Sequence, residues 1–195
     1  MGRDLQRRLI VFSGPPCSGK TALAERLAAR WAIPHLEMDA IRSRLLPDGT
    51  HDKHQRDIAY RALHLMAETL VELGQPVILD ATYGPLEHRR ELEEVARKAG
   101  VDILLVECKV SPEAAVRRFR RRPGGHPAVD LTAERVAENV RGFPYAGEGL
   151  VLDTEDSLDS CLSQIEDYID GGRSIRLGQW SSSPDRVPSP AAVLG

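Results

Sequence analysis

The sequence predicts an α/β protein with a doubly wound parallel sheet. Segments typical of strands alternate with segments typical of helices over most of the 195 residues, as in a series of βαβ units. Residues 77–79 and 103–106 are unbroken apolar runs, a pattern expected of parallel strands that helices cover on both faces. The helix ends are also marked: residues 111–113 form a Ser-Pro-Glu start, and Gly74 and Gly100 lie where helices should stop.

The pattern assigns each element a position. Strands are predicted at residues 8–13, 35–38, 76–81, 102–110 and 149–153. Helices are predicted at residues 20–31, 41–46, 55–73, 86–99, 112–121, 133–141 and 158–169. In an open sheet of this kind the ligand binds at the carboxyl ends of the strands, so polar residues that directly follow a strand are the first candidates for a site.

Length and composition favour one domain. A chain of 195 residues with 42% hydrophobic content can bury one core, and we place this domain at residues 1–170. From residue 171 the sequence is rich in Gly, Ser and Pro without periodicity, so residues 171–195 are predicted to be a disordered tail. Trp180 could dock the tail on the domain, but one aromatic side chain is too little to predict it.

Charge and cysteine usage exclude several classes of protein. The net charge is -3, from 26 basic and 29 acidic residues, which gives no overall attraction to nucleic acid or an anionic membrane. The three cysteines form no C-x-x-C pair and the six histidines form no ligand pattern, so neither a disulfide framework nor a zinc site is indicated. We expect a cytoplasmic protein, since reduced thiols fit that compartment and no signal peptide or long apolar span is recognisable.

The strongest motif is a phosphate-binding loop at residues 14–21, which reads G-x-x-x-x-G-K-T between a predicted strand and a predicted helix. The main-chain N–H groups of such a loop face nucleotide phosphates, helped by the helix N-terminus. The lysine would reach the β- and γ-phosphates and the threonine hydroxyl would bind Mg²⁺. A chance glycine-rich turn is the alternative, which the flanking strand and helix disfavour. The predicted nucleotide-binding residues here are Gly14, Cys17, Ser18, Gly19, Lys20 and Thr21.

A carboxylate follows the second predicted strand, in the segment Met38-Asp39-Ala40-Ile41-Arg42. At the carboxyl end of that strand, Asp39 would lie beside the phosphate loop and could accept the proton of an attacking hydroxyl. Arg42, three residues later, could orient this carboxylate or hold an anionic substrate. The alternative is structural: Asp39 caps a helix and Arg42 is solvated.

A second carboxylate ends the third predicted strand, which reads Val-Ile-Leu-Asp at residues 77–80. A hydrophobic strand that ends in Asp is the Walker B pattern, and Asp80 would hold Mg²⁺ opposite Thr21. Aspartates that merely begin a turn are the alternative. Thr82 could support either the metal or the substrate, and Glu37 and Asp80 are the next candidate bases after Asp39.

Residues 117–122 contain five arginines and precede a Gly- and Pro-rich segment at residues 123–127. A basic helix end of this kind is typical of a mobile lid over nucleotide, where arginines neutralise charge on the transferred phosphoryl group. A solvated basic face, or cations placed at a helix C-terminus, are the alternatives.

The order of these motifs along the chain resembles that of the small P-loop kinases related to the polynucleotide 5′-kinase domain, chloramphenicol phosphotransferase and gluconate kinase. The resemblance spans roughly residues 8 to 170 and implies a P-loop NTPase three-layer fold, with a five-stranded parallel sheet of order 2-3-1-4-5 and a short lid at residues 124–130. It implies ATP and Mg²⁺ as cofactors and Asp39 as the base, with Arg42 beside it. It also implies that Arg118 packs on the adenine and that Arg122 approaches the phosphates.

These expectations combine into an ATP-dependent kinase that phosphorylates a hydroxyl of a small molecule. A polynucleotide 5′-hydroxyl kinase is the enzymatic alternative, although low aromatic content and negative charge disfavour a nucleic-acid groove. A non-catalytic nucleotide-binding switch is the other alternative. The acceptor and the oligomeric state are not predicted. Tyr60 and His64, four residues apart on one helix face, could line an acceptor pocket or could simply pack.

Overall fold

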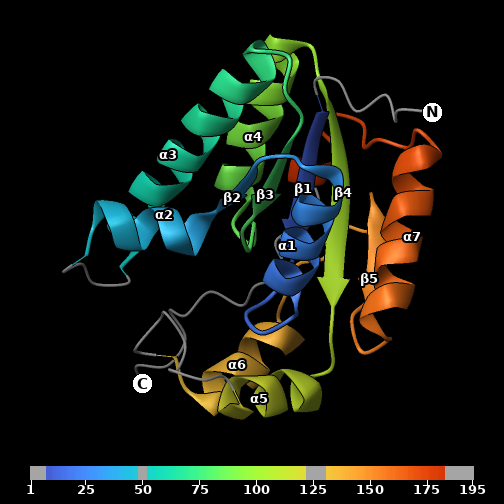
Figure 1. Ribbon diagram of the computed structural model, residues 1–195. Coiled ribbons are helices and arrows are strands. Elements are labelled where there is room, and N and C mark those ends of the chain that lie inside the picture. Colours follow the sequence, from blue (N-terminus) through green and yellow to red (C-terminus); the bar gives the residue numbers. More distant parts are fainter. Residues whose placement is uncertain (1–7, 48–51, 122–130, 183–195) are drawn as a thin grey trace.

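The computed structural model describes residues 8–47, 52–121 and 131–182. Within this part of the chain, five parallel strands form one sheet in the order β2-β3-β1-β4-β5, which confirms the expected fold (Figure 1). The strands are β1 (Arg8–Ser13), β2 (His35–Glu37), β3 (Val77–Asp80), β4 (Asp102–Lys109) and β5 (Leu150–Asp153).

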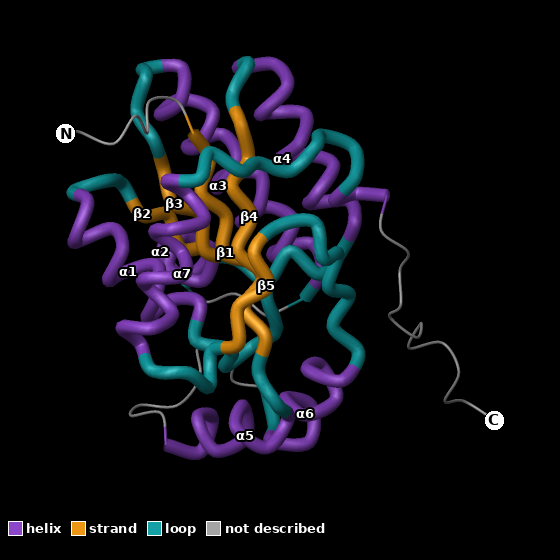
Figure 2. The backbone as a smooth tube through the Cα atoms, turned by 90° about the vertical axis from the view of Figure 1, so that its right-hand side faces the viewer, coloured by secondary structure: helices purple, strands orange, loops and turns teal. Residues whose placement is uncertain are grey.

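Helices cover both faces of this sheet (Figure 2). One face packs against α1 (Lys20–Trp31) and α7 (Leu158–Asp170), and the other against α3 (Lys53–Glu72) and α4 (Leu86–Ala99). The strands supply both cores because successive side chains point to opposite faces. In β1, Leu9 and Val11 join the α3–α4 core, whereas Ile10 and Phe12 join the α1–α7 core.

The carboxyl ends of the strands carry the remaining helices. α2 (Met38–Leu45) follows β2 directly, while α5 (Pro112–Arg121) and α6 (Ala133–Arg141) pack on each other beyond the end of β4. In Figure 1 the arrows of the sheet point down towards the α5–α6 pair. The predicted lid segment, residues 124–130, lies outside the described residues, and so does Arg122.

The start of the predicted disordered tail is instead packed on the domain. In residues 171–182, Ile175 and Trp180 are buried in the α3–α4 core, and the Ile175 N–H donates to the carbonyl oxygen of Ile103 at 3.0 Å. The Trp180 ring lies 5.1 Å from the ring of Tyr83 and against the guanidinium of Arg89. The prediction of disorder was therefore wrong for residues 171–182. The rest of the predicted tail, residues 183–195, lies outside the described part of the chain.

Among the helices that the structure describes, none is both long and apolar enough to cross a membrane.

Candidate active site

The phosphate loop links β1 to α1, and its two glycines have separate structural reasons. A Cβ atom at Gly14, where φ is +152°, would lie 2.6 Å from the carbonyl oxygen of Cys108, so the strand beside the loop leaves no room for a side chain. Gly19 precedes the first residue of α1 with φ at +90°, a left-handed conformation that glycine adopts without strain. The loop therefore turns sharply and presents the N-terminus of α1 to the cleft.

Lys20 is buried at the first position of α1. Its Nζ donates to the carbonyl oxygen of Pro15 at 2.9 Å and lies 3.5 Å from Oγ of Ser18. The ammonium is thus held against the loop by a carbonyl oxygen and a hydroxyl of the loop itself. This is a concentrated positive region, as an oligophosphate requires.

Thr21 and Asp80 meet at the end of the adjacent strands β1 and β3. Phe12 pairs with Asp80 in the sheet register, and the Thr21 hydroxyl donates to Oδ2 of Asp80 at 2.6 Å. His35 Nε2 lies 3.8 Å from the same carboxylate oxygen. A hydroxyl and a carboxylate are oxygen donors of the kind that Mg²⁺ prefers, so these two residues fit the expected metal.

In the segment after β2, Asp39 does not cap the helix and Arg42 is not solvated. The N-cap of α2 is Glu37, whereas Asp39 lies in the first turn and provides no cap. Arg42 is buried rather than solvated, and its Nη2 lies 3.7 Å from Oδ1 of Asp39. Asp39 itself is 37% exposed towards the cleft, so it combines access to a ligand with a fixed cationic neighbour.

Glu37 is a third carboxyl group at this edge of the sheet. Burial raises its pKa above the ordinary value, and the charges of Asp80 and Asp39 raise it further. Three carboxyl groups within one region repel one another when all are ionised. A cation between them would relieve that repulsion, which is consistent with a metal at Thr21 and Asp80.

Arg118 reaches from α5 to the phosphate loop. Its guanidinium donates to the carbonyl oxygen of Cys17 at 3.4 Å, to Oγ1 of Thr154 at 3.0 Å, and to the carbonyl oxygen of Thr154. Arg118 thereby ties α5 to the loop and to the residue that follows β5. Arg121, one turn later, also lines the cleft.

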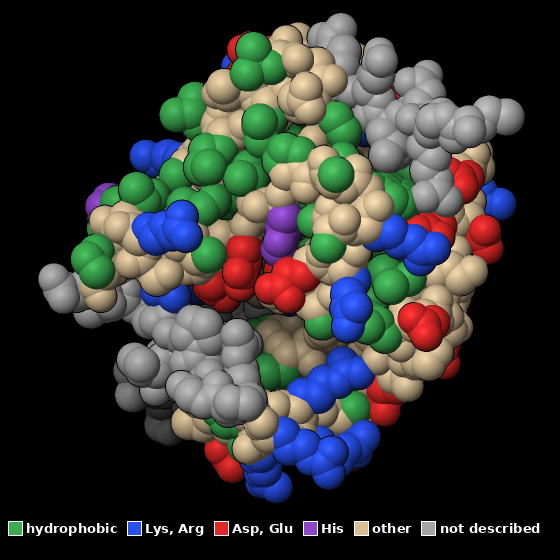
Figure 3. Space-filling view, viewed as in Figure 1, with side chains coloured by type: hydrophobic (Ala, Val, Ile, Leu, Met, Phe, Trp, Pro, Cys, Tyr) green, Lys and Arg blue, Asp and Glu red, His purple; other side chains and the backbone are tan. Residues whose placement is uncertain are grey.

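These groups surround one cleft of about 550 Å³. Figure 3 shows a hollow with acidic side chains on its upper edge and basic side chains on its lower edge, over α5. The lining residues come from the phosphate loop and α1, from the ends of β2 and β3, and from α5: Pro16, Cys17, Gly19, Lys20, Thr21, Ala22, Glu25, Glu37, Met38, Asp39, Asp80, Ala81, Thr82, Arg118 and Arg121.

Some predicted site residues belong behind the cleft rather than in it. Tyr60 and His64 are buried in the α3–α4 layer, so the packing alternative holds for them. Tyr60 still reaches the site indirectly, because its hydroxyl lies 3.0 Å from Oγ1 of Thr82, a cleft residue, and accepts from the N–H of Tyr83 at 2.9 Å.

Sequence reasoning did not assign a site role to Glu25 or Thr154, and it included Arg121 only as a member of the arginine cluster at residues 117–122. Glu25 lies one turn after Thr21 on α1, so the helical repeat could have placed it on the side of the cleft. Thr154 is close to the loop only because β5 is the last strand of the sheet beside β4. That proximity is a tertiary property without a local signal.

Comparison with known proteins agrees with this geometry. The family described as an AAA domain (AAA_33) matches residues 9–144, more than half of the chain. The cytidylate kinase of Methylocella silvestris is 32% identical over 120 residues, which is 60% of this chain and 49% of that protein. The match thus spans about half the length of the curated relative.

Solved structures share the fold. The APS kinase of Mycobacterium tuberculosis superposes with a TM-score of 0.66 at 24% identity, covering 84% of this chain and 97% of that one. A gluconokinase from Sinorhizobium meliloti superposes with a TM-score of 0.64 at 17% identity, covering 86% and 93%. The chain therefore belongs to the AAA_33 family of P-loop domains, and its resemblance to the small P-loop kinases is confirmed.

Proposed function

We propose that this protein is an ATP- and Mg²⁺-dependent phosphotransferase that moves the γ-phosphate to a hydroxyl of a small molecule. One observation carries the proposal: Lys20, Asp80 and Asp39 line the same cleft as two arginines of α5. A phosphate-binding side and a candidate base thus face one space, as in-line phosphoryl transfer requires.

Each residue has a chemical role in this proposal. The loop N–H groups and Lys20 bind the phosphates, while Arg121 offsets charge that develops on the transferred group. Arg118, which the family resemblance places on the adenine, lines the same cleft. Asp39 accepts the proton of the acceptor hydroxyl, and Arg42 keeps its carboxylate in place. Thr21 and Asp80 would hold Mg²⁺, which neutralises phosphate charge when bound. The candidate base and the candidate metal ligands thus line the same cleft.

The names of the similar proteins support a kinase but point to different acceptors. They include an APS kinase solved with AMPPNP and APS, a gluconokinase, a sugar kinase and a cytidylate kinase. These names therefore do not identify the acceptor of this chain, whereas its own cleft residues favour one class. Glu25, Glu37 and Asp39 make one wall of the cleft acidic, which favours a neutral hydroxyl compound over a polyanion such as a nucleic acid end.

The test is a screen for ATP consumption with hydroxyl compounds of several classes: sugars, polyols, nucleosides, antibiotics, and also gluconate, cytidylate and oligonucleotide 5′ ends. We expect acceptor-dependent ADP formation with a neutral compound, and its loss by at least about 10²-fold in the Lys20→Ala variant. Saturable ATP binding without transfer to any acceptor would instead support the non-catalytic switch. Wild-type rates in Lys20→Ala would contradict the proposed phosphate site.

A further inference from the structure

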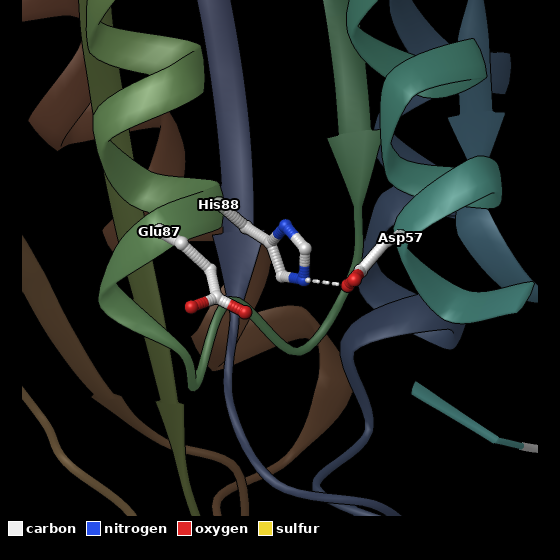
Figure 4. Close-up of side chains that lie close together, drawn as sticks. All are labelled: Asp57, Glu87 and His88. Atoms are coloured by element: carbon white, nitrogen blue, oxygen red, sulfur yellow. Dashed lines mark ion pairs between the residues drawn. The ribbon is translucent and has the colours of Figure 1, made fainter. Parts of the chain in front are cut away.

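A second group of ligand-type side chains lies where α3 and α4 begin. Asp57 is in the second turn of α3, and Glu87 and His88 are in the first turn of α4. One ligand atom from each of the three lies within 4.8 Å of the others. Figure 4 shows the His88 ring pointing at the Asp57 carboxylate, with Glu87 beside it. This group is separate from the residues that line the cleft.

A buried histidine, His88, distinguishes this group from a simple cluster of carboxylates. Its side chain is 2% exposed, and neither ring nitrogen has a hydrogen-bond partner among the described residues. Its Nδ1 lies 3.5 Å from Oε2 of Glu91, and its Nε2 faces Asp57, so Nε2 is the nitrogen that a metal would use. The ring is held in position because it stacks on Tyr60 with centroids 3.8 Å apart.

The geometry of this nitrogen fits coordination better than hydrogen bonding. His88 Nε2 lies 3.4 Å from Oδ1 of Asp57, and that oxygen also has no hydrogen-bond partner within the described chain. Two ligands that bind one tetrahedral metal at about 2.0–2.2 Å are separated by roughly 3.3–3.6 Å. The observed separation therefore leaves a metal-sized position between two polar atoms that lack other partners.

A cation already contacts the two carboxylates. Lys53 Nζ lies 3.1 Å from Oδ2 of Asp57 and 2.8 Å from Oε1 of Glu87. The Lys53 side chain is 67% exposed, so little is lost when it swings into solvent. The ammonium does not contact Oδ1 of Asp57 or Nε2 of His88, which have no hydrogen-bond partner among the described residues, and these are the atoms that a metal would use.

We propose that Asp57, Glu87 and His88 form a binding site for one divalent transition-metal ion, Zn²⁺ by preference, at the junction of α3 and α4. An imidazole nitrogen with two carboxylates suits Zn²⁺, whereas Mg²⁺ prefers octahedral oxygen ligands. Three protein ligands leave the fourth position to water.

The site has a structural consequence. The metal joins the first turns of two helices, and His88 connects it to Tyr60, whose hydroxyl contacts Thr82 at the cleft. Binding of Zn²⁺ therefore stabilises the layer behind the cleft, and unfolding becomes dependent on the metal concentration.

The test titrates the full-length, nucleotide-free protein with Zn²⁺ alone in a calorimeter, with Mg²⁺ as the comparison. Glu87→Gln removes one carboxylate ligand from the proposed site. The Glu87 side chain is 51% exposed, so the fold should tolerate the substitution. Glu94→Gln, on the exposed face of α4, is the matched control. We expect one Zn²⁺ per chain, affinity at least about tenfold weaker in Glu87→Gln and unchanged in Glu94→Gln, and no comparable binding of Mg²⁺.

Lys53→Ala tests the competing interpretation, in which the cluster is only an ion-pair network. Removal of the competing ammonium should tighten Zn²⁺ binding by roughly 2- to 10-fold, since two exposed ion pairs no longer have to break. The proposal is overturned if no stoichiometric binding occurs, if Glu87→Gln and Glu94→Gln bind Zn²⁺ equally, or if Lys53→Ala binds it no more tightly than wild type. None of these readouts depends on phosphotransferase activity.

Discussion

The two sides of the cleft are built in different ways. The phosphate side is a contiguous loop whose shape is set by backbone geometry: Gly14 faces the Cys108 carbonyl, and Gly19, the N-cap of α1, has a left-handed conformation. The acceptor side is built from side chains of separate elements, with Asp39 on α2, and Tyr60 on α3 behind Thr82. In the proposed function, the first side recognises what all nucleotides share, whereas the second varies with the acceptor.

The largest expected effect concerns the acceptor side. Asp39→Asn removes the candidate base but keeps its shape, so phosphoryl transfer should fall by about 10²–10⁴-fold while the Kd for ATP changes little. Steady-state rates and calorimetric ATP titrations measure the two quantities separately. Glu37→Gln, which changes the neighbouring carboxyl group, is the comparison.

If Asp39→Asn transfers phosphate normally and Glu37→Gln does not, the base is Glu37 and the role proposed for Asp39 is wrong.

The layer behind the acceptor side also depends on residues after 170. Trp180 is fully buried against Tyr83 and Arg89, and Tyr83 in turn packs on Tyr60. Trp180→Ala should lower the free energy of unfolding by about 3–5 kcal/mol, measured by urea denaturation. A change below about 1 kcal/mol would mean that the segment does not support the core.

On the phosphate side, a single methyl group should be enough to disturb the loop. Gly14→Ala places a Cβ atom 2.6 Å from the Cys108 carbonyl oxygen at a φ of +152°, which costs on the order of 1–3 kcal/mol and should weaken ATP binding. Gly84→Ala is the control, because its φ is not in the left-handed region and its nearest neighbour lies at 3.9 Å. Equal ATP affinity in the two variants would contradict the importance of this backbone geometry.

The smallest effect is a pH dependence of stability. Burial lowers the pKa of His64 from 6.5 to about 3, with a smaller contribution from His88. Glu91 lies 3.4 Å from the His64 ring, but its carboxylate is partly exposed and screened by solvent. Between these two pKa values the unfolded chain binds a proton that the folded chain does not, so His64 reduces stability as the pH falls below 6.5.

The loss is at most about 1.4 kcal/mol per pH unit. His64→Gln should make the free energy of unfolding less sensitive to acid between pH 6 and pH 4, whereas His54→Gln, which changes an exposed histidine, should not. Parallel urea titrations at each pH measure the difference. Identical slopes in wild type and His64→Gln would show that His64 is not buried in neutral form.

Most of the phosphate side could be predicted because its determinants are local. The loop motif occupies eight consecutive residues, and the apolar strands with their helix ends gave the limits of α1, α4, α5 and α6. Asp80 could be placed opposite Thr21 because two parallel strands end at the same edge of the sheet.

The rest required tertiary information. Ile175 and Trp180 are isolated apolar residues in a Gly- and Ser-rich segment, so no periodicity indicated that they would be buried. Asp57 and His88 meet only because α3 packs on α4, and the sequence alone suggested no metal ligands there. For the same reason the sequence could not decide whether Tyr60 and His64 line a pocket or pack in the core.

The most direct test of the central claim is calorimetric titration of the wild-type protein and Lys20→Ala with ATP in the presence of Mg²⁺. The claim is that the loop at residues 14–21 and the cleft in front of it bind a nucleoside triphosphate. It predicts saturable 1:1 binding by the wild type and a loss of affinity of at least about tenfold in the variant. If neither ATP nor GTP binds the wild-type protein, or if Lys20→Ala binds equally well, the proposed function is contradicted.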